Sequence, residues 1–516
     1  MKQMRNSILV AIVVSMSSLL TFAQQSVSGT VLDTDGNPLP GVNVVVEGTS
    51  QGTTTDFDGN YQISVENGST IVFSYIGFQN QLLVVGEAES YDIEMILGNQ
   101  LSEVVVSALG SVKENRALGY SIQTVQGENI ENAKETNIIN SLQGQIAGVQ
   151  IQGSPSTLGG SSRITIRGSN SFLGNNQPLF VIDGVPVDNS NFASNSQQSG
   201  FGGGAYDYGN MAGDIDPSTV KSMSVLKGAA ATALYGSRGA NGVILITTKD
   251  GSGAKRGVGV SINSSVTFDQ VDNLIPMQQM YGGGSINSNY PHGFSELIQD
   301  GVTYLYPNYK KDGAWGPKYD PNVLVRHWDS WDPTAANYKE TRPWIAPENG
   351  FEEFFETGVT VNNTIAFEGA NDKGSFRLGY TNLDQTGTIP QSNLQRNSVS
   401  LNSNYNLTDK LKAGISMNYV NTTADGRNAT GYNNNNPMQA FNQWWQTQLD
   451  IERLENNQDN GLGQQYTWNP VGPIVDPDTK QLVEWNANPN YFDNPYWIRN
   501  NYLQEDVRNR LFGNAN

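Results

Sequence analysis

Cysteine is absent from the chain, and histidine occurs only twice, at His292 and His327. Without cysteine there is no disulfide and no thiolate chemistry. The two histidines do not have the spacing of a ligand pair, which argues against a zinc peptidase site. They also do not supply the convergent catalytic set that a hydrolase needs. We therefore predict that the protein is not an enzyme and uses no cofactor.

Basic residues are scarce as well. The 30 Lys and Arg are outnumbered by 49 Asp and Glu, so the formal net charge is −19. Nucleic-acid binding is disfavoured, because neutralising phosphates requires clustered Lys and Arg. Glycine is abundant instead, with 55 residues, and Asn, Ser and Thr crowd the second half of the chain. This composition is typical of strands and turns, and a chain of 516 residues is expected to hold more than one domain.

Long apolar runs are missing, apart from a short one at the amino terminus. Lys2 and Arg5 precede an apolar run from Ile8 to Leu20, and Thr21-Phe22-Ala23 follows with small residues. The run is shorter than the about 20 residues of a membrane-spanning helix. Residues 1–23 are therefore predicted to be a cleaved signal peptide, with an anchoring helix as the alternative. Because no cysteine follows the run, a lipid anchor is excluded.

Residues 24–98 are predicted to form a β-sandwich. The stretch from Gly29 to Val44, GTVLDTDGNPLPGVNV, alternates apolar and polar residues, and turns are expected at Asp35-Gly36 and Asp58-Gly59. The pattern resembles the carboxypeptidase-regulatory-like, transthyretin-type domain. A role as spacer or as partner-docking module is favoured over a ligand site.

Residues 111–250 contain three motifs in a fixed order. They are RITIRG from Arg163, QPLFVIDGVPV from Gln177, and a segment from Asp216-Pro217 through an Ala-rich helix ending at Gly236 into the strand VILITT. Together they resemble the plug domain of the SusC/RagA-like TonB-dependent outer-membrane transporters. Helical spacing of apolar residues predicts a further helix over Asn137–Gln150. Gly239 and Gly242 are expected where positive φ is needed.

Between sandwich and plug, residues 99–110 contain a short segment of high β-propensity. Such a segment can add itself to the sheet edge of a partner through main-chain hydrogen bonds. In the resembled family this is the position of the TonB box. The alternative is a last edge strand of the sandwich. The residues predicted to contact TonB are Leu101, Ser102, Glu103, Val104, Val105 and Val106.

Residues 251–516 alternate apolar and polar residues over runs of 10 or more, beginning at Val258. This is the length that tilted membrane-spanning strands need, and in lipid such strands must close into a barrel. The connections alternate between long (about 271–357 and 424–502) and short, as in outer-membrane barrels. The fold class is thus mainly β: a β-sandwich, an α/β plug, and the first strands of a transmembrane antiparallel barrel. About six strands are present against about 22 in plugged barrels, so we expect the chain to be part of a longer protein.

All the tryptophans lie in the two long connections. Beside Asn, Asp and Gln they suit stacking on sugar rings, contact with a partner protein, or a core that keeps the loops folded. Asp476-Pro477-Asp478 and Asn457–Asn460 offer oxygen ligands for a structural Ca²⁺, but without the spacing of a dedicated loop. The candidate recognition residues are Trp315, Trp328, Trp331, Trp344, Trp444, Trp445, Trp468, Trp485 and Trp497.

The resemblance implies TonB-dependent import of an oligomeric nutrient across the outer membrane, with a SusD-like surface lipoprotein covering the barrel. TonB on the periplasmic side and outer-membrane lipid are the other implied partners. An oligosaccharide substrate is favoured over an oligopeptide. The alternatives are a secreted adhesin or scaffold, and a receptor for siderophores or cobalamin.

Overall fold

In the computed structural model, the described residues are 24–34, 36–49, 51–76, 78–96, 104–106, 112–114, 122–133, 135–153, 157–172, 176–190, 192, 206–254, 257–272, 274–286, 291–461 and 463–516. The signal peptide predicted at residues 1–23 lies outside them. The chain forms two compact units, one of residues 1–105 with 112–119 and one of residues 106–111 with 120–516. Across the described ranges, no helix is both long and apolar enough to cross a membrane.

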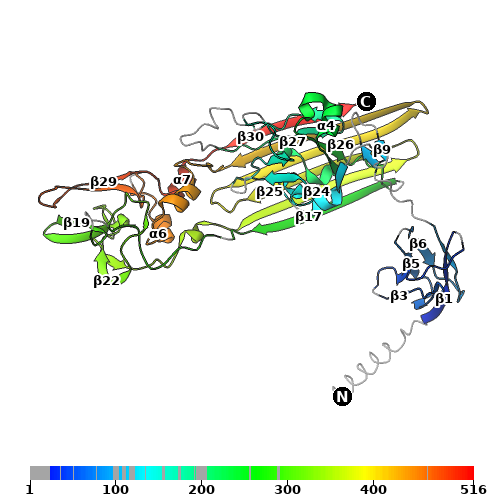
Figure 1. The fold of residues 1–516 in the computed structure, drawn as a ribbon, viewed down its shortest axis with the longest axis horizontal. Coiled ribbons are helices and arrows are strands. Elements are labelled where there is room, and N and C mark those ends of the chain that lie inside the picture. Colours follow the sequence, from blue (N-terminus) through cyan, green and yellow to red (C-terminus); the bar gives the residue numbers. More distant parts are fainter. Residues whose placement is uncertain are drawn as a thin grey trace, which may run out of the picture. The chain divides into compact units, whose positions relative to one another are not determined.

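The first unit contains a β-sandwich, as predicted (Figure 1). One sheet has the order β4-β1-β7 and the other the order β3-β2-β5-β6. Val27, Ile71 and Phe73 are fully buried in the core between them. The strands are β1 (Gln24–Asp33), β2 (Asn43–Val46), β3 (Gly52–Thr54), β4 (Asn60–Glu66), β5 (Thr70–Ser74), β6 (Gln81–Val84) and β7 (Ile93–Met95).

The second unit begins with an α/β region, which we define as the described residues between 122 and 254. Its five-stranded sheet has the order β10-β15-β16-β13-β14, and a separate hairpin pairs β11 with β12. The strands are β10 (Ile122–Gln126), β11 (Val149–Gln152), β12 (Arg163–Ile166), β13 (Leu179–Ile182), β14 (Val185–Val187), β15 (Val220–Leu226) and β16 (Val243–Thr248). The helices are α2 (Gly127–Asn132), α4 (Ala229–Tyr235) and the 3-10 turns η4 (Asn140–Leu142), η5 (Met211–Asp214), η6 (Pro217–Thr219) and η7 (Gly236–Gly239).

Two predictions for this region were wrong. The segment Asn137–Gln150 is not an α-helix, because its only helical element is the 3-10 turn η4. Its apolar residues are nevertheless buried. Their helix-like spacing therefore indicated which side chains are buried, but not the secondary structure. Gly242 has a φ of 94°, as expected, but Gly239 does not lie in the positive-φ region. A Cβ at Gly239 would lie 2.5 Å from the carbonyl oxygen of Ala231, so close packing is what requires glycine there.

A long antiparallel sheet follows, and its strands pair in chain order (Figure 1). The apolar side chains of its first strand, such as Val258 and Ile262, are exposed. On the opposite face, which we call the inner face, Ser398, Ser400 and Asn402 are buried. This alternation confirms the predicted wall of a partial barrel. The strands are β17 (Gly257–Asp269), β24 (Gly358–Asn371), β25 (Gly374–Thr386), β26 (Asn393–Thr408), β27 (Leu411–Asp425) and β30 (Asp506–Ala515).

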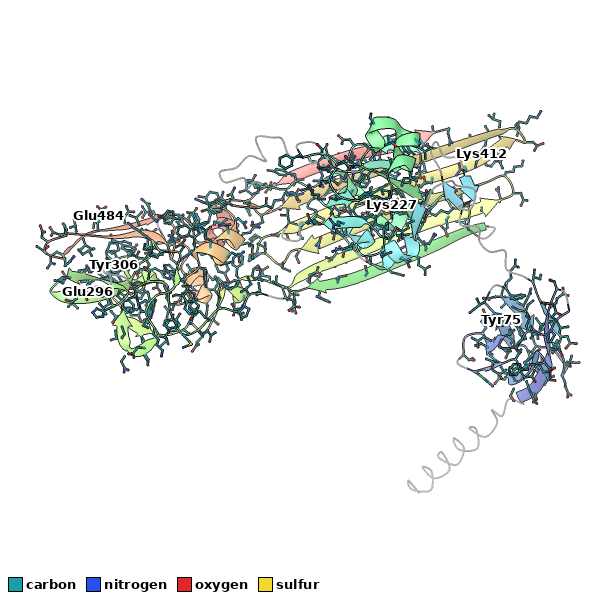
Figure 2. The ribbon with its side chains drawn as sticks, viewed as in Figure 1. Tyr75, Lys227, Glu296, Tyr306, Lys412 and Glu484 are labelled. Carbon is teal, nitrogen blue, oxygen red and sulfur yellow. The ribbon has the colours of Figure 1, made fainter. Side chains whose placement is uncertain are left out.

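The two long connections, after β17 and after β27, fold together into what we call the loop lobe. Residues from both connections share one aromatic core; Trp328, for example, belongs to the same buried cluster as Trp468. Tyr306 lies in this lobe (Figure 2). It packs edge-on against Trp331 at 5.6 Å between ring centroids. The elements are β18 (Gly284–Ser285), β19 (Phe294–Gln299), β20 (Val302–Pro307), β21 (Ala314–Trp315), β22 (Asp320–Val325), η8 (Trp328–Ser330), β23 (Arg342–Trp344), η9 (Phe351–Phe354), α5 (Pro437–Gln439), η10 (Ala440–Trp444), α6 (Ile451–Asn456), β28 (Pro470–Val475), β29 (Leu482–Pro489) and α7 (Pro495–Asn501).

The sandwich should be sensitive to truncation of its aromatic core. Phe73 is fully buried and packs edge-on against Tyr61 at 5.0 Å. We expect Phe73→Ala to lower the free energy of unfolding of the sandwich by about 3–5 kcal/mol, because it leaves a cavity. The measurement is chemical denaturation followed by tyrosine absorbance. Phe57→Ala is the matched control, since Phe57 is 93% exposed, and an equal loss in both variants would contradict the prediction.

Candidate site between the plug-like region and the long sheet

The α/β region contacts the inner face of the long sheet mainly through polar groups. Arg396 on β26 is almost completely buried there. Its Nη1 donates to the carbonyl oxygen of Thr136 at 3.0 Å and to that of Gly213. Both acceptors lie outside β-strands, so no neighbouring strand pairs with them. A guanidinium has five N–H donors, and one arginine can therefore satisfy several such carbonyl groups.

Asp214 is a buried carboxylate of the α/β region that faces two strands of the sheet. Its Oδ1 accepts hydrogen bonds from Nη2 of Arg508 at 3.0 Å and from the hydroxyl of Thr422 at 3.3 Å. Its Oδ2 lies 3.7 Å from Nη1 of Arg510. The side chain is only 1% exposed, so water screens these attractions weakly. Loss of either partner would leave a charge uncompensated in the interface.

Arg427, just after β27, holds a second stretch of the α/β region. Its Nη1 donates to the carbonyl oxygens of Leu158 at 2.9 Å and of Asp207 at 3.0 Å. Its Nε pairs with Asp506 on β30, which fixes the guanidinium. Segments of the α/β region that are far apart in sequence are thus joined to the sheet by one set of side chains. We call this set the arginine cluster: Arg396, Arg427, Arg508 and Arg510.

Shorter polar side chains complete the contact elsewhere. The hydroxyls of Ser218 and Thr381 lie 3.2 Å apart, and Nη2 of Arg377 donates to the Ser218 carbonyl at 3.3 Å. Ser416 on β27 donates to Oδ2 of Asp183 at 3.0 Å. These contacts place neutral and charged hydrogen-bonding groups across the width of the sheet.

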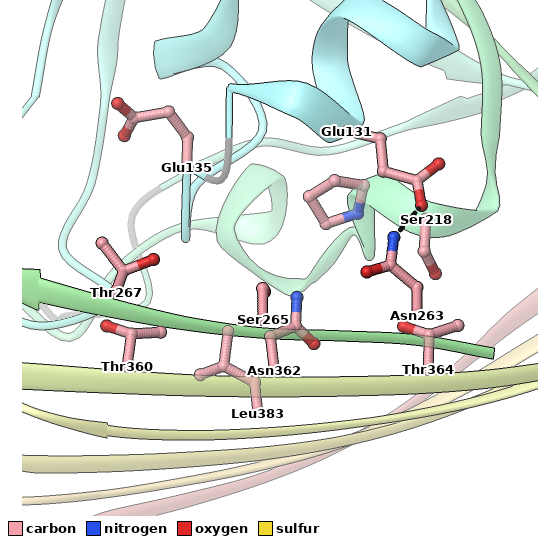
Figure 3. Close-up of a pocket in the computed structure, with 11 residues that line it drawn as sticks. Glu131, Glu135, Ser218, Asn263, Ser265, Thr267, Thr360, Asn362, Thr364 and Leu383 are labelled. Atoms are coloured by element: carbon pink, nitrogen blue, oxygen red, sulfur yellow. Dashed lines mark hydrogen bonds between the residues drawn. The ribbon is translucent and has the colours of Figure 1, made fainter. Parts of the chain in front are cut away.

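A polar cavity lies between α2 and the strands β17 and β24 (Figure 3). Glu131 of α2 accepts a hydrogen bond from Nδ2 of Asn263 at 2.9 Å and pairs with Lys249 at 2.9 Å. Hydroxyl and amide groups of this kind give a water molecule the two to four partners it needs. The polar lining from the sheet is Asn263, Ser265, Thr267, Thr360, Asn362 and Thr364.

The polar character of this interface decides what it can do. Among the described residues, apolar contact is limited: Leu158 packs against Leu383, Leu394 and Ala424. Phe512 of β30 also packs against the apolar core of the α/β region. A hydrogen bond between protein groups contributes only about 0.5–1.5 kcal/mol net, because water replaces the lost partner. Separation of the two surfaces therefore exposes groups that water can solvate, whereas separation of an apolar interface would cost about 25 cal/mol for each Å² exposed. The arrangement combines specific positioning with the capacity to come apart.

The segment predicted to bind TonB is only partly within the described residues. Val104–Val106 form the short strand β8, which pairs with β9 (Val112–Glu114). Leu101, Ser102 and Glu103 lie outside the described residues. An extended backbone is the conformation that main-chain pairing requires. The role of this segment stays a prediction.

The tryptophans differ in their exposure. Trp331 stacks on Trp485 at 5.0 Å between centroids, with 11° between the ring planes. Trp315 is 70% exposed and lies 5.6 Å from the ring of Tyr281. Most of these side chains thus belong to the core of the lobe, and Trp315 is the exposed one. The buried ones are Trp328, Trp331, Trp344, Trp445 and Trp468, and the half-buried ones are Trp444, Trp485 and Trp497.

One carboxylate, Asp329, joins the two connections of the lobe. Arg342 donates to both of its oxygens, at 2.6 and 2.9 Å, and Arg453 of the other connection donates at 3.3 Å. His327 lies beside this group, and no described residue pairs with its buried Nε2. Burial, reinforced by the positive charges of Arg342 and Arg453, lowers the pKa of His327 to about 3.

The candidate calcium ligands form ordinary turns. Oδ1 of Asp476 accepts hydrogen bonds from the backbone N–H groups of Asp478 at 3.0 Å and Thr479 at 2.8 Å. These bonds lower the pKa of Asp476. No group of three or more His, Cys, Asp or Glu within the described ranges could hold a metal ion. The absence of a cofactor stays a prediction.

The arginine cluster was missed from the sequence. A signal was available: Arg396 shares the polar alternation of β26 with Ser398 and Ser400, and positive charge on the inner face is unusual in so acidic a chain. No sequence pattern, however, indicated that the acceptors would be carbonyl groups of the α/β region, because these come from loops.

Charge removal at Asp214 should loosen the α/β region locally. We expect Asp214→Asn to lower the free energy of opening of segment 206–216 by about 3 kcal/mol, because Arg508 and Arg510 lose their buried counter-charge. Hydrogen exchange measured by mass spectrometry reports this opening directly. Asp384→Asn is the control, since Asp384 is exposed on the same sheet. Unchanged protection of the segment in Asp214→Asn would contradict the assignment.

The loop lobe should lose stability in mild acid. Because the folded pKa of His327 is lower than its unfolded value of about 6.5, the unfolded state binds the extra proton. The contribution of His327 to the free energy of unfolding is therefore fully present above about pH 6.5. Below that pH, the free energy of unfolding falls by up to about 1.4 kcal/mol for each pH unit. Tryptophan fluorescence during denaturation between about pH 5 and 7 measures this, because all nine tryptophans lie in the lobe. This pH dependence of the free energy of unfolding should vanish in His327→Gln and persist in His292→Gln. A free energy of unfolding that does not change with pH in the wild-type protein would contradict the prediction.

Comparison with known protein families matches two segments of the chain. A CarboxypepD_reg-like domain matches residues 27–106. A TonB-dependent Receptor Plug Domain matches residues 114–243. The second match covers most of the α/β region that rests on the inner face of the sheet.

Curated relatives match much more of the chain. TonB-dependent receptor SusC of Bacteroides thetaiotaomicron is 32% identical over 496 residues, which are 92% of this chain and 42% of the relative. TonB-dependent receptor P26 of Formosa agariphila is 31% identical over 396 residues, 77% of this chain and 34% of the relative. The chain thus spans less than half the length of these relatives. A structure of the RagAB peptide importer in its open-open state is 23% identical, with a TM-score of 0.44, and covers 64% of this chain and 33% of that one.

The curated relatives are named as receptors, which agrees with the prediction that the protein is not an enzyme. The domain matches confirm the predicted plug and the predicted carboxypeptidase-regulatory-like sandwich, in the predicted order. In its sequence and in its domain order, the chain is similar to the SusC-like TonB-dependent receptors over the part of their length that it spans.

Proposed function

We propose that this protein imports an oligomeric nutrient across the outer membrane, with energy delivered by TonB. The observation that carries the proposal is the polar interface between the α/β region and the inner face of the sheet. We call the α/β region the plug from here on, because the plug-domain family matches it. An importer needs a plug that is positioned precisely enough to close the pore and that can leave its place. Carbonyl groups bound by arginine side chains meet both needs, since each bond is specific and each can be replaced by water.

In the proposed cycle, substrate binding outside makes the segment from Leu101 to Val106 available in the periplasm. TonB pairs with it by strand addition and pulls on the plug. The contacts of the arginine cluster then break one after another, so no single step has to overcome the sum of them. The polar cavity beside Glu131 supports this sequence, because water already has partners at that edge of the interface.

For the substrate, a glycan is favoured over an oligopeptide. Trp315, which lies beside the half-buried Tyr281, supports this choice, because exposed aromatic rings stack on the faces of sugar rings. A SusD-like lipoprotein is the proposed partner on the outer surface. The RagAB comparison names a peptide importer, so an oligopeptide is the second candidate substrate.

An engineered disulfide tests whether the plug must move. The chain has no cysteine, so introduced pairs are unambiguous. Ser218→Cys with Thr381→Cys should join plug to sheet, because the two hydroxyls lie 3.2 Å apart. We expect uptake of labelled oligosaccharide by cells to fall at least about tenfold when the pair is oxidised and to recover after reduction.

The matched control shares one of the two positions. Thr364→Cys with Thr381→Cys joins two strands of the sheet, whose hydroxyls lie 3.0 Å apart, and leaves the plug free. This variant should import normally in both redox states. Full uptake through the locked plug would overturn the proposal. Uptake of a labelled oligopeptide or a ferric siderophore, in place of the oligosaccharide, would overturn the choice of glycan.

A further inference from the structure

The two outward faces of the sandwich differ in their apolar content. On the outward face of the sheet β4-β1-β7, Ser26 lies opposite Ser64 and Ser28 opposite Gln62. That face is polar, as expected for an antiparallel sheet with one face in water.

The outward face of the other sheet holds apolar residues beside polar ones such as Asn43 and Ser74. Val45 lies opposite Val72, and Val72 lies opposite Leu82, so these three side chains form one row across β2, β5 and β6. Val84 stands in the next row on the same face, opposite Thr70. The inward face of this sheet is already used, since Ile71 is fully buried in the core. The sheet therefore has apolar residues on both sides, although its own fold needs them only on one.

The exposed part of this row lies on an edge strand. Leu82 is 64% exposed and Val84 is 66% exposed, and β6 is the last strand of its sheet. A contiguous exposed apolar row on a small domain is typical of a contact surface and not of a solvated face. An edge strand adds main-chain groups that can pair with a further strand. We call the four residues Val45, Val72, Leu82 and Val84 together the apolar face.

The charge around this face has one sign. Between Arg5 and Lys113 the sequence contains no Lys, Arg or His. Glu47 borders the face directly, because its N–H donates to the carbonyl of Thr70 at 2.9 Å. Interfaces generally have an apolar centre and a polar rim, and here any charged rim is acidic. The acidic residues of this stretch are Asp33, Asp35, Glu47, Asp56, Asp58, Glu66, Glu87, Glu89, Asp92, Glu94 and Glu103.

We propose that the apolar face docks a basic protein segment that adds a strand to β6, with apolar side chains on the face and Lys or Arg around it. Charge complementarity selects this occupant. A second copy of the sandwich would bring its own purely acidic rim and be repelled. An anionic lipid surface would be repelled for the same reason. The proposal concerns the sandwich alone and does not depend on import.

The test uses the full chain in detergent and labelled peptides of about ten residues. One peptide alternates Lys and Val, a second alternates Glu and Val, and a third alternates Lys and Ser. We expect the Lys–Val peptide to bind at least about tenfold more tightly than either twin, measured by fluorescence anisotropy, because it alone matches both apolar face and charge. Equal binding of the Glu–Val or the Lys–Ser peptide would overturn the proposal.

Variants locate the binding on the apolar face. Leu82→Ser with Val84→Ser should weaken binding about tenfold. The control, Gln62→Ala with Ser64→Ala on exposed positions of β4, should leave it unchanged. If the double variant fails to fold, Val84→Lys provides the test instead. The positive charge that it places on the apolar face should repel the Lys–Val peptide and weaken binding. Unchanged affinity in a folded Leu82–Val84 variant would overturn the proposal. Self-association of the wild-type protein in sedimentation that is lost in this variant would also overturn the proposal. Binding of the wild-type protein to phosphatidylglycerol vesicles that is lost in this variant would do the same.

Discussion

The second unit depends on the pairing of the plug's loop carbonyl groups with donors from the sheet. Backbone polar groups that are withdrawn from water must be paired, and those of Thr136, Leu158 and Asp207 have no strand beside them. Successive residues of each strand of the sheet point to opposite faces. The inner-face positions include arginines, whose guanidinium groups supply the donors, while the alternate positions form the apolar outer face. Period-two alternation thus places the outward surface and the seat of the plug on the same strands.

Two kinds of packing coexist in the second unit, and they have different consequences for motion. The loop lobe is held by a closely packed aromatic core, which favours one rigid arrangement. The plug is held by hydrogen bonds and ion pairs over a surface with few apolar contacts. Force applied to the chain would therefore loosen the plug before the lobe. The lobe's joining residue, Asp329, is itself buried between two arginines from different connections.

Patterns of alternation and turn residues were enough to predict the sandwich, the strands of the long sheet and the helix that ends at Gly236. They failed where tertiary contact decides. Ile138, Ile139, Leu142 and Ile146 are spaced as in a helix, yet they enter the core from turns. The arginine cluster could not be predicted, since its acceptors are carbonyl groups and no side chain marks them. The tryptophans were assigned to the lobe correctly, but only burial separates Trp315 from the rest.

The distribution of charge connects these regions. Of the few basic side chains, several arginines are buried between plug and sheet, where they donate hydrogen bonds to plug carbonyl groups and carboxylates. Arginines that are buried in this interface do not offset the negative charge elsewhere, so the sandwich and the outer surfaces have an excess of acidic residues. An acidic surface repels anionic lipids and other acidic proteins. The same property leaves basic segments as the partners that the apolar face of the sandwich can attract.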